Sequence, residues 1–148
     1  MNGDAGDTGE TGTPASLELA KGRAALADTE QASHPASHGN DGDVETRWCP
    51  SNGSAGHWWR VDLGAVRELT GVTITFEFAE RLYGYRIDVS DDDASWTTVL
   101  DLADNPKLTQ VQSEPLSTRG RYVRFWALAL QATPTTWSCF WELELFGY

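Results

Sequence analysis

Basic residues and long apolar segments are scarce in this chain of 148 residues. Eleven Lys and Arg residues stand against 22 Asp and Glu residues, which gives a formal net charge of −11 at pH 7. No apolar run approaches the roughly 20 residues that a membrane-spanning helix needs. Because a chain of this charge repels nucleic-acid phosphates and anionic lipid headgroups, we expect neither a nucleic acid nor a membrane as a partner. Neutral ligands and cations fit the composition better.

Recognisable catalytic and zinc-binding motifs are also missing. The spacing of His34, His38 and His57 fits neither an HExxH motif nor a Cys and His zinc site. The chain contains no GxSxG motif and no phosphate-binding loop. Carboxylate pairs arise by chance among 22 acidic residues, so they carry little information about catalysis. The sequence therefore predicts a protein that is not an enzyme.

Alternating apolar residues are the dominant pattern, and a length of 148 residues suits one folded domain. A period of two is typical of strands with one buried face, whereas no segment of ten or more residues has convincing helical periodicity. Seven tryptophans supply large apolar surface for a core. Short strands separated by Gly, Asp, Asn and Pro turns predict a β-sandwich. Strand candidates are residues 57–63, 72–78, 83–89, 95–101, 121–130 and 139–147.

The first 16 residues differ from the rest in composition. Gly3, Gly6, Gly9 and Gly12 alternate with Asp, Glu and Thr, and almost nothing apolar is available for burial. A glycine every third residue is also found in collagen, but four repeats are too few for a triple helix. We therefore predict a flexible, acidic, glycine-rich linker at 1–16 and a folded module at 17–148.

An acidic window precedes a tryptophan at residues 41–48. Asp41, Asp43, Glu45 and Thr46 fall within this short segment. They could form a solvated turn, half of a catalytic carboxylate pair, or a set of hard oxygen ligands for a metal. An EF-hand fits poorly, because its sixth position requires Gly and its twelfth Glu, whereas counting from Asp41 gives Thr46 and Asn52.

Six segments, in the right order, resemble those of one known family, the F5/8 type C (discoidin) domains, and within it the family 32 carbohydrate-binding modules. The resemblance covers nearly all of residues 17–148 and implies an eight-stranded jelly-roll β-sandwich. Such modules often accompany secreted bacterial glycoside hydrolases. The segments are LAKGRAALADT, DGDVETRW, HWWRVDLG, YGYRIDVSDDDASW, RYVRFWA and WELELFG.

The same resemblance implies a structural calcium ion. Members of the family hold the ion between a loop that precedes a tryptophan and a glutamate on the last strand, and calcium takes six to eight oxygen ligands. A turn whose acidic residues face water remains the alternative. The implied ligands are the side chains of Asp41, Asp43, Thr46 and Glu142 with the backbone carbonyls of His38, Thr46 and Trp141.

Cys49 and Cys139 are the only two cysteines. If Thr46 and Glu142 meet at one ion on antiparallel strands, the same register places the two cysteines opposite each other. We therefore predict a disulfide, with two buried free thiols as the alternative. A disulfide would fit an oxidising setting, and we expect the protein to be secreted or on the cell surface.

The resemblance places a sugar site on loops at one end of the sandwich. There an aromatic ring stacks on a pyranose while polar side chains bind its hydroxyl groups. Trp137 follows the polar stretch QATPTT, whereas Trp48, Trp58 and Trp96 match apolar anchors of the family. The alternative is that Trp137 covers an edge of the core and that Arg81 pairs with a surface acid. The candidate sugar contacts are Trp137, His34, Glu77, Arg81 and Tyr83.

We therefore predict a calcium-stabilised, monomeric module that binds a neutral oligosaccharide or polysaccharide and holds an attached glycoside hydrolase near its substrate. One alternative is a discoidin-type module that recognises a membrane or a protein surface through exposed aromatic side chains. The other alternative is a structural spacer without a ligand.

Overall fold

Antiparallel β-strands account for the regular structure, as the alternating pattern predicts. The computed structural model describes residues 16–128 and 137–148. Residues 1–15 of the predicted linker lie outside the described residues, so the linker stays a prediction. None of the helices in the described residues is long and apolar enough to cross a membrane. The elements are β1 (Leu17–Glu18), β2 (Ala25–Ala27), the 3₁₀ helix η2 (Ala36–Gly39), β3 (Trp58–Phe76), β4 (Tyr85–Ser90), β5 (Thr97–Leu102), β6 (Val111–Ala127) and β7 (Phe140–Gly147).

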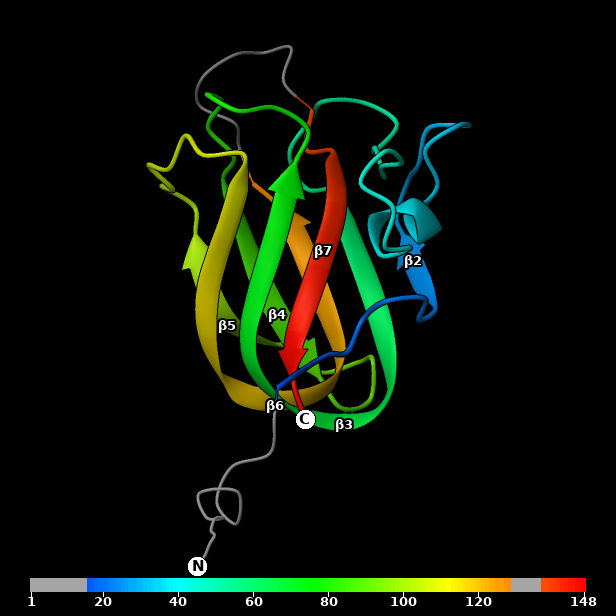
Figure 1. The fold of residues 1–148 in the computed structure, drawn as a ribbon, viewed down its shortest axis with the longest axis vertical. Coiled ribbons are helices and arrows are strands. Elements are labelled where there is room, and N and C mark those ends of the chain that lie inside the picture. Colours follow the sequence, from blue (N-terminus) through cyan, green and yellow to red (C-terminus); the bar gives the residue numbers. More distant parts are fainter. Residues whose placement is uncertain (1–15, 129–136) are drawn as a thin grey trace, which may run out of the picture.

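Two long strands, β3 and β6, bend and run through both layers of the sandwich (Figure 1). One layer holds β1, β7, the second half of β3 and the first half of β6. The other holds β2, the first half of β3, the second half of β6, β4 and β5. The all-β jelly-roll sandwich is thus confirmed. The described residues contain seven strands rather than eight, because segments 57–63 and 72–78, expected as separate strands, belong to β3.

The core lies between the two layers and is rich in aromatic rings. Trp48, Trp59 and Phe140 are fully buried, and the ring centroid of Phe140 lies 5.3 Å from each of the two tryptophan rings. Phe125 of β6 joins this group, with its centroid 5.2 Å from that of Phe140. Edge-to-face contacts of this kind stabilise a core beyond simple area burial. The cluster therefore fastens the start of β7 to both layers.

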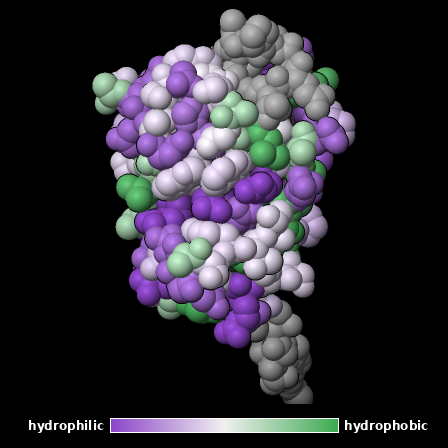
Figure 2. Space-filling model, turned by 180° about the vertical axis from the view of Figure 1, so that it is seen from behind, coloured by the Kyte–Doolittle hydropathy of each residue, from purple (hydrophilic) through white to green (hydrophobic). Residues whose placement is uncertain are grey.

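The other tryptophans on β3 and β6 face outward, because side chains alternate along a strand. Trp58, expected as a core anchor, points away from the core that its neighbour Trp59 enters. Arg124 lies over the rings of Trp96 and Trp126, at 4.0 and 4.7 Å from their centroids. The face seen in Figure 2 is mostly hydrophilic to intermediate in hydropathy. Trp58 and Trp96 thus lie partly exposed outside the core, contrary to expectation.

Several loops meet at one end of the sandwich. β3 and β6 end there, and β4 and β7 begin there, at the top of Figure 1. The segment between β2 and β3 is attached at this end by an isolated antiparallel bridge between Trp48 and Phe140. Parts of the chain that are far apart in sequence thus lie together where the sequence predicts the sugar site.

Candidate functional site

A cavity of about 210 Å³ opens among these loops. Its walls come from the segment between β2 and β3, the loop after β3 and the residues that precede β7. Its lining combines two aromatic rings with convergent polar groups, a combination that small-ligand sites commonly have. The lining residues are Gln31, Arg47, Cys49, Glu77, Phe78, Trp137 and Cys139.

Arg47 is held in a single place by three contacts. Its Nε lies 3.2 Å from an oxygen of Glu77, and its guanidinium carbon lies 5.1 Å from the centroid of the Trp141 ring. The same Nε lies 3.2 Å from Sγ of Cys49, which accepts a hydrogen bond. A guanidinium has five N–H donors, so Arg47 keeps donors at Nη1 and Nη2 for a ligand.

Glu77 is fixed through its backbone as well as its side chain. Its N–H donates to the carbonyl of Cys139 at 3.1 Å, and its own carbonyl accepts from Nε1 of Trp141 at 3.3 Å. Burial raises the pKa of Glu77, and the charge of Arg47 opposes that rise. The cavity thus presents a positioned donor group beside a positioned acceptor group.

Aromatic side chains form two parts of the wall. Trp137 lies against the backbone of Gly53, where an added Cβ would approach Cδ1 of the ring to 2.8 Å. Phe78 is 44% exposed, and the guanidinium of Arg81 lies over its ring at 5.4 Å from the centroid. An exposed aromatic ring in a hollow is suited to stacking on a flat apolar ligand surface.

Some of the residues expected to contact a sugar line the cavity, and others lie beside it. Trp137 and Glu77 line the cavity, while Arg81 covers Phe78 and forms no ion pair with Glu80 within the described residues. His34 lies beside the cavity, where its carbonyl accepts from the N–H of Cys49. Burial lowers the pKa of His34, and the positive charges of Arg47 and His38 lower it further.

Tyr83 is a correction to the predicted site. Its side chain is 1% exposed, and its ring stacks on that of Phe76 with centroids 4.1 Å apart. The hydroxyl accepts from the N–H of Phe78 at 3.2 Å, and burial raises the pKa of Tyr83 to about 12. The period of two that buries Tyr85 and Ile87 buries Tyr83 too. Tyr83 therefore supports the backbone below Phe78 and cannot stack on a sugar.

A disulfide joins Cys49 to Cys139, as the register argument predicts, so the two cysteines are not free thiols. The neighbouring residues Trp48 and Phe140 exchange two backbone hydrogen bonds of 3.0 and 3.2 Å. Both sulfur atoms lie within 4.8 Å of a carboxylate oxygen of Glu77, the only such trio of candidate metal-ligand atoms among the residues described. Because the sulfurs are bonded to each other, this trio cannot bind a metal.

The acidic loop, which comprises residues 41–46, contacts β7 on the opposite side of the strand pair that Trp48 and Phe140 form. The hydroxyl of Thr46 donates to Asp41 at 2.6 Å, and the N–H of Gly42 donates to Oε2 of Glu142 at 3.0 Å. Glu142 is 5% exposed, and its buried Oε1 has no hydrogen-bond partner among the described residues. Burial, together with the charges of Asp41 and Glu144, raises the pKa of Glu142 to about 8. A buried carboxylate beside a second carboxylate is stabilised by a cation.

Asp43 takes a different part in this loop from Asp41. One of its carboxylate oxygens accepts from the N–H of Glu45 at 2.9 Å, and its carbonyl accepts from the N–H and the hydroxyl of Thr46. The Asp43 carboxylate is therefore engaged in the turn. The candidate metal-ligand atoms are all oxygens, and one of them, Oε1 of Glu142, is buried and unpaired among the described residues. The residues present therefore fit a calcium ion.

Sequence comparison now identifies the fold. A family model described as the F5/8 type C domain matches residues 24–143. The chain belongs to this family. A comparison with curated proteins gives no match.

Solved structures of carbohydrate-binding modules are similar to this chain. Chitosan-binding module 1 from a chitosanase/glucanase of Paenibacillus sp. IK-5 is 28% identical, with a TM-score of 0.76, over 88% of this chain and 99% of that one. Module 2 of the same enzyme, in complex with chitotriose, is 27% identical, with a TM-score of 0.71, over 87% and 99%. A family 32 module from Clostridium perfringens, in complex with glcNAc-alpha-1,4-galactose, is 17% identical, with a TM-score of 0.79, over 93% and 98%. The resemblance seen in the sequence is thus confirmed.

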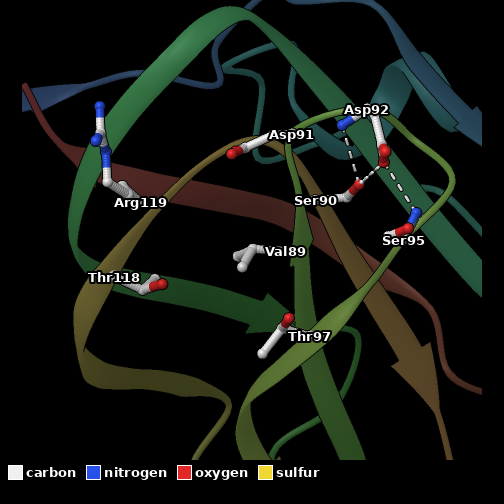
Figure 3. A pocket seen from close by; sticks show the side chains of 8 residues that line it. All are labelled: Val89, Ser90, Asp91, Asp92, Ser95, Thr97, Thr118 and Arg119. Carbon is white, nitrogen blue, oxygen red and sulfur yellow. Dashed lines mark hydrogen bonds between the residues drawn. The ribbon is translucent and has the colours of Figure 1, made fainter.

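This F5/8 type C domain has a larger cavity at the opposite end of the sandwich, about 360 Å³ in volume (Figure 3). Its lining contains no aromatic side chain. An oxygen of Asp92 accepts from the N–H groups of Ala94 and Ser95 and from the hydroxyl of Ser90, so this carboxylate closes a turn. The lining residues are Val89, Ser90, Asp91, Asp92, Ser95, Thr97, Thr118 and Arg119. The smaller cavity, with its aromatic walls, is the better candidate.

Three lining residues of the smaller cavity were missed in the sequence: Gln31, Arg47 and Phe78. Phe78 ends the alternating run that begins at Val72, so the pattern predicts it on the buried face. In this F5/8 type C domain β3 ends at Phe76, and Phe78 turns outward. Nothing in the sequence alone distinguishes Gln31 or Arg47 from other polar loop residues.

Proposed function

We propose that this chain is a non-catalytic carbohydrate-binding module whose cavity receives one sugar ring of a glycan. The observation that carries the proposal is the joint lining of a 210 Å³ cavity by Trp137, Phe78 and the paired Arg47 and Glu77. An aromatic ring can stack on the apolar face of a pyranose, while the guanidinium donates to hydroxyl oxygens and the carboxylate accepts from hydroxyl groups.

The expected affinity is weak. A shallow site for one sugar gives about −4 to −6 kcal/mol, which corresponds to millimolar to high micromolar dissociation constants. Weak binding suffices for a module that is tethered to an enzyme, because the tether raises the local concentration of substrate. We propose that the parent protein carries a glycoside hydrolase and is secreted or on the cell surface. The disulfide suits an oxidising compartment.

Two classes of glycan, neutral and positively charged, are candidates for the ligand. A neutral glycan suits the paired and thus neutralised Arg47 and Glu77. A glycan of amino sugars is favoured by a net charge of −11 and by the 27–28% identity to two chitosan-binding modules. A field of this sign attracts a cationic polymer. Isothermal titration with chitotriose and with its fully acetylated, neutral counterpart separates the two candidates.

We further propose that calcium stabilises the acidic loop. Asp41, Thr46 and Glu142 would hold the ion, with the side chain of Asp43 and the backbone carbonyls of His38, Thr46 and Trp141 as the remaining oxygen donors. The ion would supply a positive charge that keeps the buried Glu142 carboxylate ionised. The unpaired Oε1 of Glu142 supports this assignment.

Affinity electrophoresis against a panel of polysaccharides, followed by titration with the best ligand, tests the glycan site. Trp137→Ala should abolish binding with little change in melting temperature. Trp58→Ala removes a partly exposed tryptophan from the outer face of the layer that holds the first half of β3, and it should leave binding intact. Full affinity in Trp137→Ala would refute the site.

The rival functions have their own assays. Sedimentation with liposomes would support a membrane-binding discoidin module, and a glycan array without any signal would support a spacer. Hydrolysis of a glycoside that disappears on mutation of a single Asp or Glu would refute the absence of catalysis.

A further inference from the structure

The disulfide forms part of the wall of the proposed glycan cavity. Cys49 and Cys139 both line the cavity, and each is 1% exposed. They come from the segment between β2 and β3 and from the residue before β7, 90 positions apart in the sequence. The bond therefore connects two separate walls of the same cavity.

Arg47 contacts the disulfide directly. Its Nε donates to Sγ of Cys49, the same nitrogen that lies against Glu77. Glu77 in turn is anchored by its N–H to the carbonyl of Cys139. Both partners of the Arg47 and Glu77 pair are thus attached to the disulfide, one to each cysteine. Movement of the two cysteines apart would separate the donor group from the acceptor group.

Trp137 depends on the bond through the chain. It lies two residues before Cys139 and packs on Gly53 of the segment between β2 and β3. Its side chain is partly buried, and the ring packs on Gly53. The position of the ring is therefore set by the short backbone connection to Cys139 and by the contact with Gly53.

We propose that the Cys49–Cys139 disulfide is a positioning element for glycan recognition, which holds Arg47 and Trp137 in their binding arrangement. The inference rests on the proposed function. A site that is ordered before binding avoids the entropy cost of ordering its side chains when the ligand arrives. Reduction of the bond lowers glycan affinity by more than the accompanying loss of folding stability explains.

The fold has other means to keep these segments together. The backbone hydrogen bonds between Trp48 and Phe140 and the packing of their two buried rings do not involve sulfur. Reduction also lowers stability, because the open chain gains entropy in the unfolded state. The test must therefore separate affinity from stability.

Reduction by a small dithiol gives the first arm of the test. The reagent supplies two electrons and two protons, the protein disulfide becomes two thiols, and the reagent becomes a cyclic disulfide. Glycan affinity is measured for the oxidised, reduced and reoxidised protein at a temperature where all three are folded by circular dichroism. We expect a loss on the order of tenfold on reduction and full recovery on reoxidation, because preorganisation lowers the cost of binding.

Two controls distinguish positioning from general weakening. The double variant Cys49→Ser/Cys139→Ser should bind like the reduced protein without any reagent present. Val61→Ala removes volume from the core at a residue that does not line the glycan cavity, and it lowers stability while the disulfide remains. It should keep the affinity of the oxidised wild type.

A double-mutant cycle tests the route through Arg47. Arg47→Ala lowers affinity in the oxidised protein, and reduction should cost much less in that background than in the wild type. Equal losses in both backgrounds would overturn a role through Arg47. Equal affinity of the oxidised and reduced wild type, with the oxidised form binding well, would overturn the inference alone.

The remaining outcomes are also decisive. If the oxidised wild type binds no glycan, the proposed function fails and the inference fails with it. If both the reduced protein and the double serine variant unfold at every temperature, the bond serves the fold rather than the site, and the inference is overturned.

Discussion

Stability in the absence of calcium should fall as the pH rises from 5 to 8, because of Glu142. The carboxyl is 5% exposed, its Oε1 has no partner among the described residues, and Asp41 lies close by. These surroundings raise its pKa from 4.5 to about 8. The folded protein therefore prefers the neutral carboxyl, whereas the unfolded chain ionises it at lower pH.

The sign and size of the effect follow from proton linkage. A group whose pKa is higher in the folded state contributes its full stability below the unfolded value, and that contribution is lost as the pH rises through the folded value. Each pH unit between the two values corresponds to about 1.4 kcal/mol, so Glu142 gives a loss on the order of 4 to 5 kcal/mol across the window. Domains of this size have free energies of unfolding of about 5 to 15 kcal/mol, so the loss is measurable.

Urea unfolding followed by tryptophan fluorescence at pH 5, 6, 7 and 8 measures this slope, first in EDTA and then in excess calcium. In EDTA the free energy of unfolding should fall steadily with pH. Calcium should flatten the curve, because a bound cation favours the ionised carboxylate, and it should raise stability by about 2.7 kcal/mol at 100 times its dissociation constant.

Two variants identify the group responsible. Glu142→Gln should remove most of the slope in EDTA, leaving a smaller fall from the raised pKa values of Glu77 and Glu144, which the lowered pKa of His34 opposes in the lower part of the pH range. Glu45→Gln removes an exposed acid from the same loop and should keep the slope. A metal-free protein with pH-independent stability between 5 and 8 would refute the reasoning about Glu142. Identical curves in EDTA and calcium would refute the metal site.

Three further predictions concern packing and ligand linkage. Gly53→Ala should weaken glycan binding in a titration while the melting temperature changes little, because the new methyl group would approach the Trp137 ring to 2.8 Å. Gly147→Ala should lower the free energy of unfolding in urea by about 2 kcal/mol or more, since its Cβ would lie 1.8 Å from the backbone carbonyl oxygen of Glu68. Glycan at 100 times its dissociation constant should raise the free energy of unfolding by about 2.7 kcal/mol.

The strands were largely predictable because alternation reports directly which side of a strand is buried. Ile74, Phe76 and Ile87 follow the pattern, and all three are buried. The continuity of β3 was not predictable from the same signal. Residues 57–63 and 72–78 were expected as separate strands, yet an irregularity in the register with β6 after Asp62 lets one strand pass from one layer to the other. Such a bend depends on the partner strand, which the local sequence does not reveal.

The site was predictable in part for a related reason. Trp137 and Glu77, which line the candidate cavity, were named because the family resemblance places a sugar site on loops at one end of the sandwich. Tyr83 was assigned wrongly although its own alternation predicts burial. Arg47 was missed because its role arises from contacts with Glu77 and Trp141, residues 30 or more positions away that the fold brings beside it. Local sequence carries little information about such contacts.

The proposed calcium and glycan sites share one pair of strand segments. Thr46 bonds to Asp41 within the acidic loop, and Glu142 bonds to Gly42 of the same loop. Their chain neighbours Arg47 and Trp141 stack on each other beside the cavity. Successive side chains of an extended chain point to opposite sides, so one pair serves each site. An ion that held Thr46 against Glu142 would also hold Arg47 against Trp141. Such a coupling would be reciprocal, so we predict that calcium and glycan strengthen each other's binding by the same factor.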